Sequence, residues 1–212
     1  MKKLTIAFAA ALLPLVASAE ITAGTIQVSG GSNLSALAGS LEETFKEPGV
    51  PNVVEKTDLW NFNLEAGALY YLTPMIGVGL DVGYDSMAAE YKFDQYKVTE
   101  TNLFIGPKVG LELPLAEKLS VFGDLGLGLV KYTAEHEDTS TGIKVSSGGG
   151  SGVGFRVGAG VKYFLIPAIS VDAGLRYRYE SYSYSFPGTD IDAKRGAFGL
   201  VVGLSGYFGG SK

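Results

Sequence analysis

The chain has 212 residues and no Cys, and its 17 basic and 22 acidic side chains give a formal charge of −5 at pH 7. Without Cys it has no disulfide scaffold, no Cys-ligated zinc site and no thiol nucleophile, and the acidic balance argues against nucleic acid as a partner. Gly contributes 30 residues, about twice its average usage of ~7%, so its placement needs a structural explanation.

The first 19 residues have the pattern of a cleaved secretory signal. Met1-Lys2-Lys3 form a short basic start, residues 4–16 are almost wholly apolar, and Ala17-Ser18-Ala19 supplies the small residues of a signal peptidase site. The apolar run is too short for a spanning helix, which needs ~20 residues. We therefore expect cleavage between Ala19 and Glu20, with residues 20–212 forming a single exported domain.

From about residue 60 onward the apolar residues recur with a period of two, which is typical of β-strands with two different faces. Val78, Leu80 and Val82, for example, alternate with Gly79 and Asp81. Eight such runs, the first of them weaker, lie at about 25–38, 60–72, 76–84, 99–113, 119–132, 154–164, 169–180 and 195–208. Strands without helices between them predict an all-β chain that forms one antiparallel barrel or sandwich.

The connections between these runs alternate in length. Three are short and contain Pro, at 72–75, 114–118 and 165–168, whereas four are longer and polar, at 40–58, 86–98, 133–151 and 182–194. This alternation is typical of an outer-membrane barrel with periplasmic turns and extracellular loops. Aromatic residues, which favour the two headgroup zones, fall at both rims: Tyr70, Tyr163 and Phe208 at the periplasmic rim, and Trp60, Tyr84 and Tyr179 at the outer rim. The sequence thus predicts an eight-stranded antiparallel up-and-down transmembrane β-barrel in the bacterial outer membrane.

Periodicity alone does not decide which face points inward, because a soluble eight-stranded barrel shows the same alternation. Gly is concentrated on the polar face, where it leaves room for long side chains in a narrow lumen, and the apolar face carries almost no charge, as lipid requires. The polar face also carries nearly balanced charges, which suits a buried core: Lys108, Arg156, Lys162, Arg176 and Arg178 against Glu65, Asp81, Glu112, Asp124, Asp172 and Glu180. We expect these side chains to form a structural polar core inside the barrel.

Three segments carry a resemblance to known proteins: residues 160–179 with Ile166-Pro167 at the turn, residues 69–84 across Thr73-Pro74, and the C-terminal run 203–208. The chain resembles the family of small outer-membrane barrels that includes OmpA-type membrane domains and opacity-type surface proteins. The resemblance implies roles in envelope integrity, adhesion or host contact. It also implies that Gly203, Tyr207 and Phe208 belong to the signal by which the barrel-assembly machinery captures the chain. Gly206 departs from this signal, because an aromatic or large apolar residue is usual there.

The motifs that could carry chemistry have simpler explanations. His136 is the only His and lies among acidic residues in a long connection, and the Gly-rich run 148–152 lacks the Lys and Ser or Thr of a phosphate-binding loop. Glu42, Glu43 and Glu47 could bind a divalent ion weakly, but a solvated charge run is the favoured interpretation. We expect no enzymatic activity, no cofactor and no metal site.

We expect a structural or surface-interaction role through four extracellular loops. The candidate partners are outer-membrane lipid and lipopolysaccharide, the barrel-assembly machinery, and a host or other cell-surface protein. Residues 182–187 alternate aromatic and hydroxyl side chains, which suits a strand extended beyond the membrane or, less strongly, a protein contact. Three alternatives stay open: a narrow porin-like channel for small solutes, an enzyme acting on lipid A, and a soluble periplasmic ligand-binding barrel.

Overall fold

The computed structural model describes residues 21–47, 49–58, 62–91, 96–138, 141–146, 149–186 and 189–209. These residues form ten β-strands, and none of them lies in a helix with the length and apolarity needed to cross a membrane. The expected cleavage site at Ala19 and Glu20 and the expected rim residue Trp60 lie outside the described residues.

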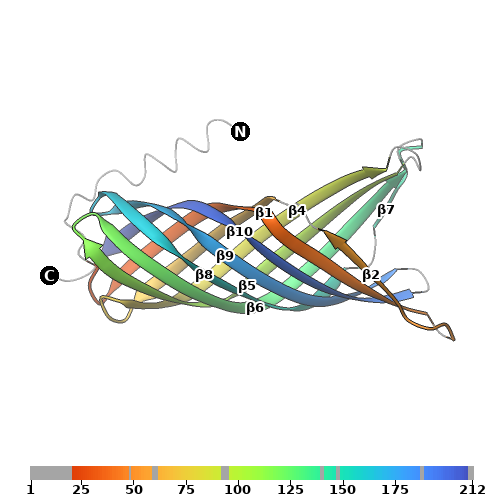
Figure 1. The fold of residues 1–212 in the computed structure, drawn as a ribbon, viewed down its shortest axis with the longest axis horizontal. Coiled ribbons are helices and arrows are strands. Elements are labelled where there is room, and N and C mark those ends of the chain that lie inside the picture. The colour runs from red at the N-terminus through yellow and green to blue at the C-terminus, as the bar shows by residue number, and fades with distance from the viewer. Residues whose placement is uncertain are drawn as a thin grey trace.

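Eight long strands close into a ring because the last pairs with the first. In ring order they are β1 (Thr25–Lys46), β3 (Phe62–Tyr71), β4 (Ile76–Tyr91), β5 (Tyr96–Ala116), β6 (Leu119–Asp138), β8 (Gly150–Ile166), β9 (Ile169–Phe186) and β10 (Thr189–Gly209). All neighbours are antiparallel, and two short strands, β2 (Val53–Asp58) and β7 (Lys144–Ser146), pair with β1 and β6. Figure 1 shows the barrel, with the start of β1 and the end of β10 at the rim of the short turns. The eight-stranded antiparallel barrel is confirmed.

Successive side chains point alternately into and out of the barrel, and this alternation separates polar from apolar residues. On β8, Arg156 is buried, whereas the adjacent Val157 is exposed. The outer faces carry a band of apolar side chains, among them Leu80 at 58%, Leu129 at 66% and Leu204 at 57% exposure. Such a continuous apolar surface is what a bilayer requires of a spanning barrel. The polar face therefore lies inside.

The strands run further outward than the sequence predicts. The expected runs end at residues 84 and 180, but β4 continues to Tyr91 and β9 continues to Phe186. The expected loops at 40–58, 86–98, 133–151 and 182–194 are therefore mostly paired strand, so this part of the prediction is wrong. Strand pairing continues beyond the predicted runs because an antiparallel sheet is stable with only one face covered. Alternating residues suit such a sheet, as where Ser183 is exposed and Tyr184 is partly buried. The strand interpretation of this last segment is confirmed as far as Phe186.

Beyond the apolar band the ring divides into two sheets. The pairing of β3 with β4 ends at Phe62 and Ser86, and that of β6 with β8 ends at Tyr132 and Gly150, so β3 and β8 contribute no described residue further out. The first outer sheet consists of β2 with residues 40–46 of β1, 189–196 of β10 and 184–186 of β9. The second outer sheet consists of residues 86–91 of β4, 96–102 of β5 and 132–138 of β6 with β7. Figure 1 shows these extensions projecting past the barrel, opposite the short turns.

Two Gly residues are required by the close approach of neighbouring strands. A Cβ atom at Gly79 would overlap the backbone carbonyl oxygen of Ala68, and a Cβ atom at Gly106 would overlap that of Leu127. Backbone atoms in a ladder cannot move aside as a flexible side chain can. Part of the high Gly content is therefore explained by contact between strands as well as by space in the lumen.

Candidate functional site

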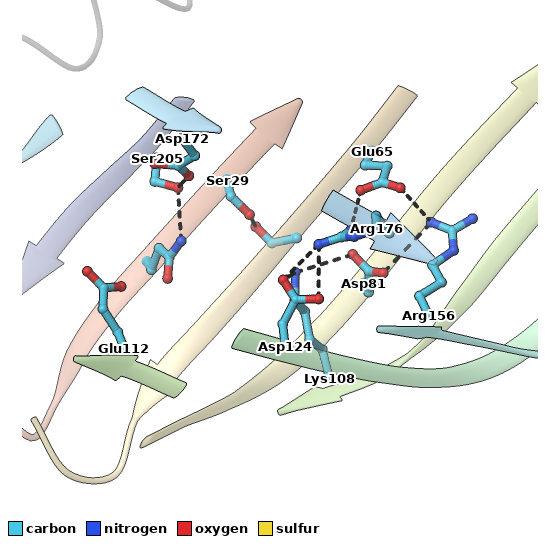
Figure 2. Close-up of polar contacts among 12 residues, drawn as sticks. Ser29, Glu65, Asp81, Lys108, Glu112, Asp124, Arg156, Asp172, Arg176 and Ser205 are labelled. Atoms are coloured by element: carbon cyan, nitrogen blue, oxygen red, sulfur yellow. Dashed lines mark hydrogen bonds and ion pairs between the residues drawn. The ribbon is translucent and has the colours of Figure 1, made fainter. Parts of the chain in front are cut away.

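Charged side chains from five strands meet in the middle of the lumen (Figure 2). The guanidinium of Arg176 on β9 donates to Asp124 on β6, with Nη2 2.7 Å from Oδ2, and it also donates to Glu65 on β3. The ammonium of Lys108 on β5 lies 3.5 Å from Asp124 and 3.8 Å from Asp81 on β4. These side chains are at most 9% exposed, so the charges compensate one another away from water.

Arg156 on β8 is held by longer contacts. Its guanidinium carbon lies 4.1 Å from the centroid of the Phe104 ring, which is a cation–π arrangement. Its nitrogens are 3.7 to 3.8 Å from the carboxylates of Glu65, Asp81 and Glu180. The guanidinium also occupies the volume that a Cβ atom at position 83 would need. The Gly at that position therefore makes room for a cation shared by three acids.

Two buried charges of this core lie outside the predicted set. Asp85 is 2% exposed and pairs with Arg178. Arg195 is 4% exposed, and its Nη1 lies 4.0 Å from Glu180. Asp85 follows the run 76–84 directly, and Arg195 is the first residue of the run 195–208. Continuing the alternation by one residue in the first run, and applying it to the first residue of the second run, would have placed Asp85 and Arg195 on the polar face.

A second polar network lies nearer the short turns and is centred on Glu112 of β5. The Glu112 carboxylate accepts hydrogen bonds from Lys162 at 2.7 Å, from Tyr71 at 2.8 Å and from Ser120 at 2.8 Å. The Lys162 ammonium also donates to the Tyr207 hydroxyl at 2.9 Å. The Glu112 carboxylate thereby connects four strands, which are β3, β5, β6 and β8. Tyr207 adds β10 to this network.

Asp172 on β9 is held by hydroxyl groups rather than by a cation. Its carboxylate accepts hydrogen bonds from Ser170 at 2.6 Å and from Ser205 on β10, and the Gln27 amide donates to Ser205 at 2.9 Å. Figure 2 shows Asp172 and Ser205 apart from the group around Arg176. The predicted interior charges thus divide into separate groups along the lumen.

A cluster of packed hydrophobic side chains lies toward each end of the lumen. At the outer end lies the outer cluster, composed of Leu41, Phe104, Val130, Tyr132, Ala134, Tyr182 and Ala193. The rings of Tyr132 and Tyr182 stack at a centroid distance of 4.8 Å. At the end of the short turns, Leu69, Tyr71 and Tyr207 pack together.

A small cavity lies in the lumen between the two polar networks. Its volume is about 60 Å³, and Lys108, Asp124, Lys162, Asp172 and Arg176 are among the residues that line it. In the described part of the chain, the lumen thus holds a polar core with a polar cavity beside it.

Hydrogen bonds also connect the strands of the first outer sheet. Tyr184 on β9 donates to Glu43 on β1 at 2.6 Å, and burial together with this hydrogen bond raises the pKa of Tyr184. Lys46 pairs with Asp192 between β1 and β10, and the hydrogen bond from Lys46 lowers the pKa of Asp192 below its ordinary value.

The other sequence-predicted residues do not gather into one site. His136 lies on β6, opposite Val98 of β5 and Val145 of β7. Tyr207 is buried in the lumen, whereas Gly203 and Phe208 are half-buried. Among the described residues, no group of three or more His, Asp or Glu is placed to hold a metal ion.

Comparison with known proteins places this geometry in a family. Residues 5–205 match the model of the outer membrane protein beta-barrel domain. The chain is similar in structure to the outer membrane protein OprG from Pseudomonas aeruginosa, with 12% identity, 89% of this chain and 98% of that chain covered, and a TM-score of 0.52. It is also similar to Neisserial surface protein A, with 16% identity, 87% and 99% covered and a TM-score of 0.48.

A third similar structure is Ail, the attachment invasion locus protein of Yersinia pestis, with 16% identity, 84% of this chain and 98% of that chain covered, and a TM-score of 0.42. At these identities the likeness concerns the fold alone. A comparison with curated protein sequences gives no match.

Proposed function

We propose that this chain, which belongs to the outer membrane protein beta-barrel domain family, acts at the bacterial surface by binding another surface component through its two outer sheets. If the bound component belongs to the same cell envelope, this binding contributes to envelope integrity. Family membership makes it an outer-membrane barrel, so the two outer sheets, which lie opposite the short periplasmic turns, face the outside of the cell.

The contrast between the lumen and the outer sheets carries this proposal. Inside, charges pair with one another and the outer cluster covers them. The outer sheets instead expose apolar side chains, among them Val53 at 52%, Val54 at 53% and Val145 at 49%. Within the described residues β2 pairs only with β1, and β7 only with β6. Exposed strand edges of this kind can accept an extended segment of a partner.

Trimming each sheet tests the proposal. In one variant a short Gly-Ser turn replaces residues 43–55, and in another it replaces residues 135–147. Cells that display each variant are compared for adherence to a panel of host-cell and matrix surfaces, and for growth in detergent when they complement a deletion strain. We expect one trimmed variant to lose adherence or detergent resistance by at least about tenfold.

The matched control is Glu117→Gln, in the exposed turn between β5 and β6 at the other end of the barrel. Heat-modifiable migration on gels establishes that each variant is folded in the membrane. If cells with either trimmed variant adhere as well, and resist detergent as well, as cells with the full-length protein, the outer sheets have no such role.

The lumen cavity of about 60 Å³ favours one alternative, a narrow channel for small solutes. Liposomes that contain the purified barrel can be placed in a hypertonic solution of a small sugar. Under the surface-interaction proposal they swell no faster than liposomes with heat-denatured protein. Faster swelling would support the channel instead.

We also propose the route by which the chain reaches the membrane. Cleavage falls between Ala19 and Glu20, and the assembly machinery recognises the end of β10 through Gly203, Tyr207 and Phe208. N-terminal sequencing of the outer-membrane form should then begin at Glu20. Phe208→Ala should lower the amount of folded barrel, and an unchanged amount would remove Phe208 from the recognition signal.

A further inference from the structure

The two outer sheets touch each other over the mouth of the barrel through tyrosine rings. Tyr184 of β9 belongs to the first outer sheet, and Tyr132 of β6 belongs to the second. Their ring centroids lie 4.7 Å apart. Tyr132 is buried in the outer cluster, and Tyr184 packs against that cluster. The contact therefore bridges the interval between the sheets, where the pairing of β6 with β8 has ended at Gly150.

Each of these two tyrosines is hydrogen-bonded to a carboxylate of its own sheet. The Tyr184 hydroxyl donates to Glu43 of β1 at 2.6 Å, and the Tyr132 hydroxyl donates to Glu100 of β5. Glu43 lies in the first outer sheet and Glu100 lies in the second, and both are partly buried. A carboxylate, two rings and a second carboxylate thus form one connected bridge between the sheets.

Titratable groups from four other strands interact with Glu100. They are Glu43 of β1, Tyr132 of β6, Tyr182 and Tyr184 of β9, and Arg195 of β10. On β6, His136 follows by two positions Ala134, the residue opposite Glu100 in the register. The cation of this group is shared, because Nη1 of Arg195 also lies 4.0 Å from Glu180 of the core. Glu43 and Glu100 therefore face each other with a cation that is divided between several acids.

Two carboxylates that share a partly buried site do not both ionise without cost, because the first charge repels the second. Burial and the charge of Glu43 accordingly raise the pKa of Glu100, against the opposing effects of Arg195 and of the Tyr132 hydrogen bond. The packed contact thus favours the protonated carboxyl of Glu100. This contribution is fully present below the ordinary value of about 4.3 and is lost as the pH rises through the higher pKa of the folded protein.

We propose that Glu43, Tyr184, Tyr132 and Glu100 form an acid-sensitive latch between the two outer sheets. When Glu100 is protonated, it no longer repels the carboxylate of Glu43, and the tyrosine rings hold the sheets together over the mouth. When Glu100 loses its proton, repulsion between the two carboxylates loosens the contact and the sheets move apart. The latch does not depend on what the outer sheets bind.

Distance measurement between spin labels on the two sheets tests the latch. The chain has no Cys, so Val54→Cys on β2 and Ser146→Cys on β7, both at exposed positions, place one label on each outer sheet. Electron–electron double resonance of the labelled barrel in nanodiscs is recorded at about pH 8 and at about pH 4.5, on the two sides of the raised pKa of Glu100. We expect a shorter and narrower distance distribution at the acidic pH. Identical distributions at the two pH values would overturn the latch.

Variants of the two carboxylates locate the response. Glu100→Gln should give the short distribution at both pH values, because its neutral amide replaces the protonated carboxyl, and Glu43→Gln should reduce the response. Asp192→Asn is the matched control, since Asp192 is an acid of the first outer sheet that pairs with Lys46 within that sheet, and it should leave the response unchanged. Heat-modifiable migration shows that each variant is folded. A full response in Glu100→Gln or Glu43→Gln, or its loss in Asp192→Asn, would overturn the proposal.

Carbon NMR of the Glu carboxyl groups follows the titration without spin labels, with the Glu100 signal assigned by its absence in Glu100→Gln. We expect its midpoint to lie above the ordinary value of about 4.3. In Glu43→Gln the midpoint should fall, with proton affinity lowered at least about threefold, which is roughly half a pH unit. A midpoint at or below the ordinary value, or one that Glu43→Gln does not move, would overturn the latch.

Discussion

Arg176 illustrates how the interior charges depend on one another. It is 4% exposed and pairs with both Glu65 and Asp124. Removing an ion from water costs several kcal/mol, and a partner regains this free energy only when the geometry is good. Because one guanidinium serves two carboxylates, its loss would leave two acids buried with fewer partners.

We therefore expect Arg176→Ala to lower the free energy of unfolding by about 3–5 kcal/mol, the usual cost of breaking a buried ion pair. Urea unfolding in detergent micelles measures this change. Lys118→Gln, an exposed residue of a periplasmic turn, provides the comparison and should change stability little. A loss in Arg176→Ala no larger than in this control would contradict the structural role of the core.

Gly79→Ala tests the close approach of β3 and β4. The added Cβ overlaps the backbone of Ala68, so we expect a loss of about 1–3 kcal/mol, as for other overpacked sites. Gly123→Ala is the matched control, because the nearest atom to its Cβ is the carbonyl oxygen of Gly158 at 3.8 Å. Similar stabilities of the two variants would show that Gly79 is not required for strand contact.

The membrane part of each strand could be predicted because lipid imposes a strict alternation. On β6, Leu125, Leu127 and Leu129 are all exposed to the outside, and each follows a residue of the inner face. Residues 86–91 escaped prediction because water accepts polar residues on either face, so a polar paired strand has the composition of a loop.

The face of each interior charge was likewise predictable, but its partner was not. Arg176 meets Glu65 across 111 residues of sequence, and that contact depends on the shear of the closed barrel.

The pairing of β1 with β10 in the first outer sheet should depend on pH. The pKa of Asp192 is lowered by Lys46, so folding favours the charged carboxylate. This contribution is present above the unfolded pKa of about 3.9 and is lost as the pH falls through the lower folded value. The pair is largely exposed, so the effect is small and local.

Amide hydrogen exchange of residues 189–195 checks this dependence. Exchange, corrected for its intrinsic pH dependence, should accelerate below about pH 4 in the unmodified chain. In Asp192→Asn the corrected rate should be higher at neutral pH and change little with acid. An acid response equal to that of the unmodified chain would show that Asp192 is not the group that titrates.

The whole molecule is a barrel with a polar core and two sheets that extend beyond its outer end. The ion-paired core occupies the lumen, the outer cluster packs at one end, and Leu69, Tyr71 and Tyr207 pack at the other. In eight-stranded barrels the interior is just wide enough for side chains to fill. The two outer sheets are the surfaces on which the proposed function depends.

Single-channel recording in planar bilayers tests this account most directly. We predict that the purified, folded protein produces no stable unitary currents at neutral pH, because side chains pack toward both ends of the lumen and the ion-paired core lies between them. Stable unitary currents that change in amplitude when Lys108 or Asp124 is replaced would contradict it, since they would show ions passing through the core.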